Sequence, residues 1–347
     1  MNIQILSRTQ ALSVDSDQWR QLAENSFYSN PFFEDWMLLP ALAHLQTQAE
    51  VYLVVAYKED RLVALFPIKK VRRRWGLGYL SVWKHRHCFL TDPLCVDPSD
   101  LTVIINQLMD RFKLSMLRIT DHSLYAYGRD IHSNSIVFPE SRGAIFKSHN
   151  IEQYLLAMPR KTRLENKRIS RRFFRQTHAS YVTSEDDKKR NWFKAFCELE
   201  HSGWKQKVKG SILSSQSDYQ FYRAVFRTDT SREKIKFQGL FNESEAFAIS
   251  FRLISNGHAF DVKTSFNETY KSLYPGVNLE LCNMHGLASE NFSLVDSCTL
   301  SNNYLINRLW PHQRKIYTSL YFHKGPLNQI LKRLYQFKNR RALHKKD

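Results

Sequence analysis

Alternating apolar and polar residues predict paired strands in both halves of the chain. Residues 247–253 alternate large apolar with small or polar side chains, as expected for a strand with one buried face. The apolar runs 235–241 and 258–264 lie on either side of it, across short turn sequences, and predict a three-stranded antiparallel sheet. In the first half, residues 51–57 and 62–71 predict a hairpin.

Helical spacing of apolar residues predicts the elements between these strands. The Pro275-Gly276 pair begins a segment whose apolar residues recur every three or four positions. The remaining segments are strand-like at 116–120, 293–298 and 315–322, and helical at 101–112 and 303–310. The order is therefore β-β-α-β in the first half and β-β-β-α-β-α-β in the second. This order predicts an α/β (α+β) chain of two related halves, each a mixed sheet flanked by helices.

The length of 347 residues fits two domains or one large one. We expect an N-terminal domain at 1–150, a C-terminal domain at 151–325 and a basic tail at 326–347. The second domain includes a basic helix at 158–176 and an aromatic-rich helical region at 192–226.

Composition and charge limit the class of protein and the partners it can bind. Hydrophobic residues at 43% and charged residues at 24% are typical of a globular protein and exclude wholesale disorder. The net charge of +18 attracts polyanions, which include nucleic acid, an anionic membrane and a phosphate-rich cofactor. No signal-peptide pattern or long apolar run is present, and the five cysteines are scattered. We therefore expect a cytoplasmic protein with reduced thiols and no metal site.

The Pro275-Gly276 turn is a candidate anion site. The amides of Val277, Asn278 and Leu279 follow a turn without bulky side chains, which suits a pyrophosphate at a helix N-terminus. The alternative is a plain helix start with proline in its first turn.

Two basic segments are candidate polyanion sites. On a helix, Arg160, Arg163, Lys167, Arg171 and Arg175 fall near one face, which could bind cofactor phosphates, a nucleic-acid backbone or acidic lipids. In the tail, the apolar positions of 327–346 line one helical face among many cations, as in helices that lie on anionic membranes. The alternatives are a solvated linker helix and a docked terminal helix.

Two further segments carry candidate chemistry. Trp204 and Lys205 could form the wall of a ligand site. The alternative is that a helix ends at Gly203 and that Trp204 packs in the core. Asp296, at a predicted strand end, could act as a general base. The neighbouring Cys298 fits an apolar filler better than a nucleophile.

Several motifs, in order, resemble one acyltransferase family. They are Asn30-Pro31-Phe32-Phe33 with Trp36, the basic stretch 155–172, Ser202-Gly203-Trp204-Lys205 with Gly210-Ser211, Tyr270 with Tyr274-Pro275-Gly276, and Asp296. The chain resembles GNAT acyltransferases of the group involved in cellulose biosynthesis (CelD/BcsL-like), which is related to Fem-type aminoacyltransferases. The resemblance spans about residues 26–322 and implies two tandem GNAT-like domains.

The resemblance also implies roles for single residues. The second domain would hold acetyl-CoA or another acyl-CoA, with pyrophosphate at Pro275, Gly276, Val277, Asn278 and Leu279, and further phosphates at Arg163 and Arg171. The thioester would lie near Lys263 and Asp296, with Asp296 as the base and Tyr270 or Tyr304 returning a proton to the CoA thiolate. Leu300 and Tyr304-Leu305 replace a Gly and a Tyr-Lys pair of many relatives. A different acceptor is therefore expected, bound by Trp204, Lys205, Asn302 and Arg308.

The expected reaction is direct acyl transfer to an amine or hydroxyl of a cell-envelope, polysaccharide or small-molecule precursor, in a ternary complex. One alternative keeps the fold but uses aminoacyl-tRNA as donor, as Fem-type relatives do. Another is a non-catalytic GNAT-like binding module. The basic tail allows peripheral contact with the anionic inner face of a membrane, and the absence of a helix-turn-helix signal argues against a DNA reader.

Overall fold

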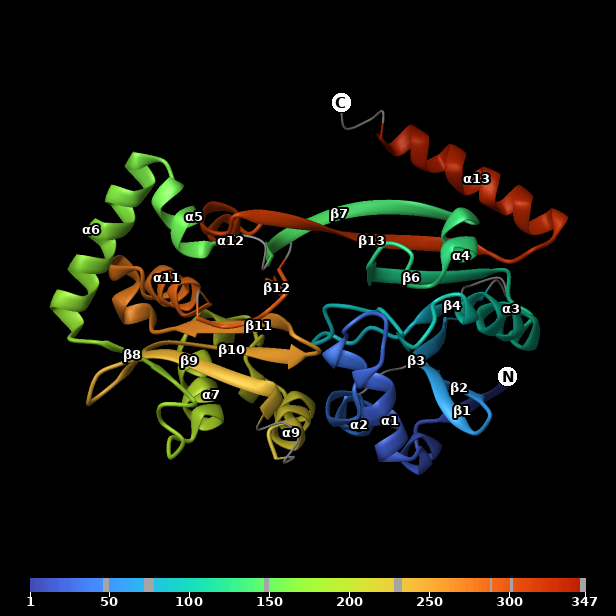
Figure 1. Cartoon of the computed structure of the whole chain (residues 1–347), viewed down its shortest axis with the longest axis horizontal. Helices are drawn as coiled ribbons and strands as arrows, with labels where there is room; N and C mark the ends of the chain where they lie inside the picture. The colour runs from blue at the N-terminus through green and yellow to red at the C-terminus, as the bar shows by residue number, and fades with distance from the viewer. Residues whose placement is uncertain are drawn as a thin grey trace. The chain divides into compact units, whose positions relative to one another are not determined.

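The computed structural model describes residues 1–45, 50–71, 78–146, 150–227, 233–287, 289–299 and 302–343. The chain forms two compact units, residues 1–140 with 315–347, and residues 141–314 (Figure 1). It passes from the first unit to the second within strand β7 (Ser135–Phe146) and returns within β13 (His312–Phe322).

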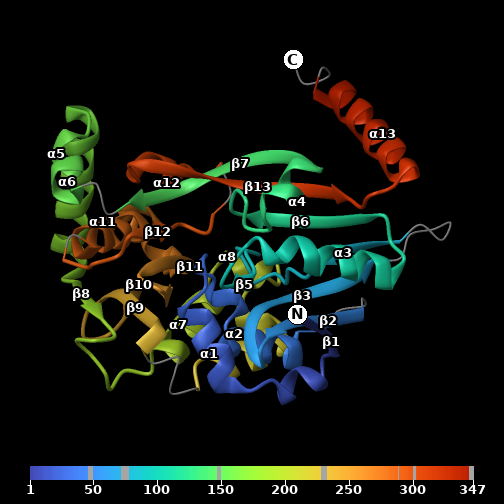
Figure 2. The ribbon, with the colours of Figure 1, turned by 45° about the vertical axis from the view of Figure 1, so that its right-hand side comes forward.

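The N-terminal unit is a mixed sheet in the order β1-β2-β3-β4-β6-β13. Neighbours from β1 to β4 are antiparallel, β4 and β6 are parallel, and β6 and β13 are antiparallel. Figure 2 shows α1 and α2 on one side of this sheet and α3 on the other. The elements are β1 Asn2–Ser7, α1 Ser16–Glu24, α2 Asp35–His44, β2 Glu50–Lys58, β3 Arg61–Val71, β4 Tyr79–Val82, β5 Leu94–Cys95 (paired with β3), α3 Asp100–Phe112, β6 Met116–His122, α4 Arg129–Ser133 and α13 Pro326–Leu343, with short 3-10 helices η1 Gln10–Ser13 and η2 Pro31–Phe33.

The C-terminal unit repeats this arrangement in the order β8-β9-β10-β11-β12-β7. Neighbours from β8 to β11 are antiparallel, β11 and β12 are parallel, and β12 and β7 are antiparallel. The elements are α5 Ile151–Ala157, α6 Arg160–Thr177, β8 Ser180–Thr183, α7 Trp192–Ser202, α8 Trp204–Lys207, η4 Ile212–Ser214, α9 Gln216–Val225, β9 Ile235–Phe241, β10 Ala246–Ser255, β11 His258–Phe266, η5 Glu268–Leu273, α11 Pro275–Leu287, β12 Leu294–Asp296 and α12 Tyr304–Leu309.

The predicted α/β fold with two related halves is confirmed, because both units have the same series of strand pairings. The units divide the chain differently from the domain limits expected at 150 and 325. Residues 144–146 pair with β12 in the C-terminal unit, whereas residues 316–322 contribute to the strand beside β6 in the N-terminal unit. Each unit thus obtains its sixth strand from the segment where the chain crosses between them.

Helices cover both faces of the C-terminal sheet, as Figure 1 shows for α7 and α9 on one face and α11 on the other. Adjacent residues of β10 point to opposite faces. Phe251 contacts Phe196 of α7 at 5.2 Å between ring centroids, while Ser250 accepts a hydrogen bond from Asn283 of α11 at 3.2 Å. This packing places α7 directly against the strands that lead to α11.

The Asn30-Pro31-Phe32-Phe33 motif has a structural role in the N-terminal unit. Asn30 caps η2 by accepting from the Phe32 amide at 3.0 Å and donates to the carbonyls of Leu90 and Asp92 at 3.2 and 2.6 Å. Phe32 and Phe33 are fully buried. The motif therefore ties a turn to the core of this unit.

Candidate functional site

Strand β12 is shorter than its neighbour β11 at the site suggested by the sequence. They pair in parallel only from His258–Leu294 to Phe260–Asp296, although β11 continues to Phe266. In the part of the chain that the structure describes, no strand pairs with that edge of β11 beyond Phe260. The free edge leads through η5 to the start of α11, so an extended ligand could follow the strand toward a helix N-terminus.

The first turn of α11 is suited to an anion. Tyr274 precedes it in the left-handed conformation at φ 55°, and the first turn contains no acidic residue. First-turn amides have no acceptor within a helix, which leaves Gly276 and Val277 to bind a ligand. The corresponding helix of the N-terminal unit, α3, begins with Asp100, which pairs with Lys58 at 2.7 Å, so its N-terminus is acidic.

Two of the residues whose backbone amides were predicted to bind pyrophosphate have their side chains in the core. The side chain of Asn278 is fully buried and donates to the carbonyls of Leu273 and Tyr274 at 3.0 and 2.9 Å. Its backbone amide donates to Tyr274 O within the helix at 3.1 Å. Leu279 is also fully buried, and Pro275 has no amide hydrogen.

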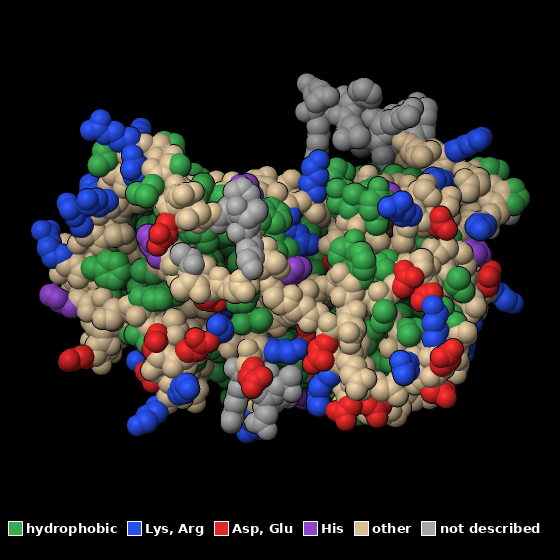
Figure 3. Space-filling model, viewed as in Figure 1, with side chains coloured by type: hydrophobic (Ala, Val, Ile, Leu, Met, Phe, Trp, Pro, Cys, Tyr) green, Lys and Arg blue, Asp and Glu red, His purple; other side chains and the backbone are tan. Residues whose placement is uncertain are grey.

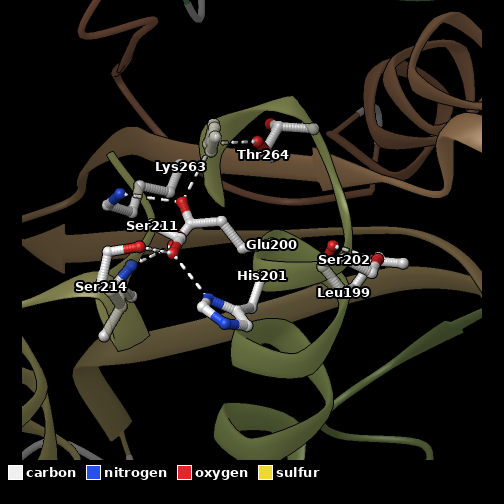
Figure 4. Close-up of polar contacts among 10 residues, drawn as sticks. Leu199, Glu200, His201, Ser202, Ser211, Ser214, Lys263 and Thr264 are labelled. Atoms are coloured by element: carbon white, nitrogen blue, oxygen red, sulfur yellow. Dashed lines mark hydrogen bonds and ion pairs between the residues drawn. The ribbon is translucent and has the colours of Figure 1, made fainter. Parts of the chain in front are cut away.

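A charged cluster lies beside the same end of β11, and Figure 4 shows its polar contacts. The carboxylate of Glu200, on α7, accepts from Lys205 Nζ and Lys263 Nζ at 3.0 Å each, both through Oε1. Its Oε2 accepts from the Ile212 amide at 2.8 Å. Lys205 Nζ also donates to the carbonyl of Thr264 on β11 at 3.0 Å. One carboxylate thus joins two lysines that the sequence had assigned to different roles.

Electrostatics keep this cluster charged. Burial opposes the charge of Glu200, but Lys263, Lys205 and the Ile212 amide outweigh it and hold the pKa of this carboxyl below its usual value. Burial lowers the pKa of Lys205, and Lys263 lowers it further, although Glu200 opposes both. The cluster therefore combines one negative with two positive side chains at the end of the free strand edge.

A neighbouring Ser–His contact has a structural role. His201 Nδ1 lies 3.0 Å from Ser211 Oγ, which in turn lies 2.6 Å from Ser214 Oγ. Ser211 is only 1% exposed, so it is not accessible as a nucleophile. These bonds hold the 210–214 segment against α7. Beside them, Glu200, Lys205, Gly203, Thr264 and Glu268 are among the residues around a recess of about 20 Å³, room for about one water molecule.

Glu200 was not predicted as a site residue, although its position in the sequence carries a signal. It lies four residues after the buried Phe196, on the apolar face of α7. A carboxylate on the buried face of an amphipathic helix requires cationic or amide partners. The nearby Lys205 was the available clue.

Asp296 lies at the last paired position of β12 and is fully buried. Its Oδ2 is 3.1 Å from Arg314 Nη1, and its Oδ1 is 3.6 Å from Arg142 Nη1. Oδ1 also accepts from the Cys298 amide at 2.8 Å. Both arginines lie within ion-pair distance of this carboxylate, and burial raises the pKa of Cys298 well above its usual value. Cys298 is thus a buried thiol, as the sequence suggested.

The other predicted site residues do not join these groups. Tyr270 donates to Glu245 Oε1 at 2.7 Å, and that bond raises the pKa of the tyrosine. Tyr304 is 76% exposed, and Asn302 is also exposed. Arg308 pairs with Glu165 at 3.0 Å. The side chain of Trp204, and Leu300, lie outside the described residues.

The basic helix predicted from the sequence is α6, and its cations are exposed. Ile169 and Phe173 are buried, and the helix's acid, Glu165, pairs with Arg308. Figure 3 shows blue side chains projecting where α6 lies in Figure 1. The exposed cations, none with an ion pair among the described residues, are Arg160, Lys161, Arg163, Lys167, Arg168, Arg171, Arg172 and Arg175.

The described residues contain no group of three or more His, Cys, Asp or Glu side chains placed to hold a metal ion. Of the helices described, none combines the length and apolar character needed to cross a bilayer.

Comparison with known proteins identifies part of the chain. Residues 160–304 match the family model described as acetyltransferase (GNAT) domain. FemX resembles the whole fold, with a TM-score of 0.59 at 9% identity, covering 96% of this chain and 100% of FemX. L-PGS from Bacillus licheniformis resembles it with a TM-score of 0.55 at 13% identity, covering 92% of this chain and 96% of L-PGS. No curated protein matches the sequence. Residues 160–304 are thus similar to a GNAT acetyltransferase domain, and the fold of the chain resembles those of FemX and L-PGS.

Proposed function

We propose that this protein is an acyltransferase that moves an acyl group from acetyl-CoA or another acyl-CoA to an amine or hydroxyl acceptor. The observation that carries the proposal is the free edge of β11 beyond Phe260, which leads to the acid-free N-terminus of α11. The GNAT match over residues 160–304 covers both elements. Assignment to the cellulose-biosynthesis group, with a cell-envelope or polysaccharide precursor or another small molecule as acceptor, rests on the sequence motifs.

In the proposed reaction, both substrates bind before transfer. The acceptor nitrogen or oxygen attacks the thioester carbonyl, the carbon–sulfur bond breaks, and the thiolate of CoA leaves. Backbone amides on the free edge of β11 would polarise the carbonyl, and the amides of Gly276 and Val277 would bind the pyrophosphate. Positioning of the two substrates supplies much of the rate.

Lys205 and Lys263 complete the site on the α7 side of β11. Their shared contact with Glu200 fixes two ammonium groups beside the strand, where they would orient an electronegative group of the acceptor. Asp296 remains the base proposed from the sequence, with Tyr270 or Tyr304 as the acid. The arginines beside Asp296 favour an alternative in which it holds the strands together.

Gly276→Ala tests the donor site. A Cβ at Gly276 would lie 3.6 Å from the Phe266 ring, an ordinary contact, so we expect unchanged or slightly greater stability. The same methyl group occupies the turn that a phosphate must approach, so we expect acyl-CoA affinity to fall by roughly tenfold, about 1.4 kcal/mol. Isothermal titration with acetyl-CoA and longer acyl-CoAs measures this loss.

The matched control is Gly286→Ala, near the other end of α11, where the added Cβ lies 3.5 Å from Tyr181 Oη. It should bind acyl-CoA as the wild type does. Equal affinity of all three proteins would remove the α11 N-terminus from the donor site. If wild-type protein binds no acyl-CoA, the proposed donor is wrong.

A second candidate function uses aminoacyl-tRNA as donor. The observation that favours it is the exposed row of cations that runs along α6. At about 1.5 Å per residue, the row from Arg160 to Arg175 spans roughly 22 Å. Arginine predominates in it, and its planar guanidinium suits phosphate oxygens.

Charge reversal on α6 separates the two donors. If RNA is the donor, Arg168→Glu with Arg172→Glu should weaken tRNA binding by at least tenfold and reduce its salt dependence by about two counterions. Arg111→Glu with Lys113→Glu makes the same change in charge in the N-terminal unit and should have little effect. Filter binding at several salt concentrations measures both. Equal weakening by the two pairs would indicate a general effect of net charge.

A further inference from the structure

The C-terminal helix α13 (Pro326–Leu343) combines positive charge with an apolar face. No acidic residue occurs between Asp296 and Asp347. From residue 326 to residue 346, the charged side chains are all cationic. They are Lys332, Arg333, Lys338, Arg340, Arg341, Lys345 and Lys346. The apolar positions 327, 330, 331 and 334 recur at intervals of three and four residues, so they share one side of the helix.

This apolar side is only partly covered by the N-terminal unit. Tyr335 contacts Phe322 at 5.7 Å between ring centroids, and Leu331 is half-buried. By contrast, Ile330 is 56% exposed and Leu334 is 60% exposed. These two residues are four apart and therefore adjacent on the helix surface. Leu331 and Tyr335 therefore pack at least in part, whereas Ile330 and Leu334 face solvent.

We propose that α13 is an interfacial helix that binds the surface of an anionic lipid bilayer, with Ile330 and Leu334 inserted among the acyl chains. The charges match, because a helix without acids meets a surface that attracts lysine and arginine. Burying the two aliphatic side chains in lipid removes apolar area from water, as in other helices that lie in the membrane plane. A nucleic-acid backbone would attract the cations but would leave Ile330 and Leu334 in water. The observations therefore favour lipid.

Vesicle flotation with the full chain tests this proposal. Wild-type protein should float with vesicles of phosphatidylcholine and phosphatidylglycerol, and should stay behind with phosphatidylcholine alone. The Ile330→Glu, Leu334→Glu variant should bind anionic vesicles at least tenfold more weakly. So should Lys332→Glu with Arg333→Glu. Leu12→Glu with Val103→Glu is the control, since these positions of the same unit are also exposed, at 69% and 47%, and it should bind as the wild type does.

Each outcome decides the matter. The thermal unfolding temperature should be unchanged in all three variants, because the altered side chains lie on the surface. If the glutamates at 330 and 334 unfold the helix, the more conservative pair Ile330→Ser with Leu334→Ser takes their place. Failure of the wild type to float, or undiminished binding by both the glutamate and the serine pair, would overturn the proposal. Binding of tRNA that Lys332→Glu with Arg333→Glu abolishes, without vesicle binding, would assign the helix to RNA. None of these results depends on the acyl donor.

Discussion

The Glu200→Gln variant should lose roughly 100-fold in acyl transfer and about 3 kcal/mol in free energy of unfolding. In the wild type, this fully buried carboxylate accepts from Lys205 and Lys263 at 3.0 Å each. A neutral amide leaves two ammonium groups facing each other, so they separate and no longer hold their positions beside β11. Urea denaturation measures the stability, and turnover with the acyl-CoA identified by titration measures the activity.

Glu198→Gln is the matched control, because Glu198 lies on the same helix with its side chain 62% exposed and 3.8 Å from Lys194. An exposed pair of this kind contributes about 0.5 kcal/mol, so this variant should behave like the wild type.

The effect of Glu200 on stability should also depend on pH. Its folded-state pKa is lowered, so its stabilising effect is complete above the usual value of 4.5 and is lost as pH falls below it. The stability difference between wild type and Glu200→Gln should therefore shrink in acid. A difference independent of pH would show that shape, not charge, is what Glu200 supplies.

The sequence predicted those helices and strands whose own residues show a clear periodic pattern. The strand expected at 235–241 is β9 with the same limits, and the helix expected at 101–112 is α3, which begins one residue earlier. In each case one face is apolar and the element is long enough for its period to be visible. The pair Pro275-Gly276 likewise marked the start of α11, because proline is compatible with a first helical turn.

Elements whose signal is short or depends on distant partners were missed. Strand β8 (Ser180–Thr183) is a four-residue edge strand, and its alternation is too brief to detect. Strand β1 (Asn2–Ser7) was missed because its pairing depends on a distant partner, β2, which follows some fifty residues later. The crossing of β7 and β13 between the units could not be predicted at all. A strand's own residues specify that it pairs, but its partner is chosen by the packing of the whole sheet.

In the candidate site, too, the sequence predicted single residues but not the contacts between distant ones. Lys205 and Lys263 were predicted for different reasons, and the structure brings them together through a third residue that neither motif contains. The backbone amide of Asn278 was predicted to bind an anion because it follows the Pro275-Gly276 turn, but that amide donates to Tyr274 O, and the side chain closes the turn between η5 and α11. Sequence position indicates which backbone amides lie at a helix start. Whether a side chain there faces a ligand or the core depends on the strand packed beneath it.

The Asp296→Asn variant should be destabilised by about 3–5 kcal/mol, a large share of the stability of a typical domain. Asparagine keeps the shape of the side chain and can still accept from the Cys298 amide, but it removes the negative charge that faces Arg142 and Arg314. Both guanidinium groups are then held in the protein interior beside a neutral amide. Urea denaturation, with activity measured at a temperature where the variant remains folded, separates this effect from catalysis.

Two results distinguish a structural Asp296 from a catalytic base. If it is structural, the double variant Asp296→Asn, Arg314→Gln should recover part of the lost stability, since one of the two arginines is also removed, and its activity should recover with folding. If Asp296 accepts the acceptor's proton, Asp296→Asn should unfold at the wild-type urea concentration yet turn over at least 100-fold more slowly, and the second substitution should restore nothing. The geometry favours the first result, because Asp296 is fully buried and each of its oxygens lies within 4 Å of an arginine.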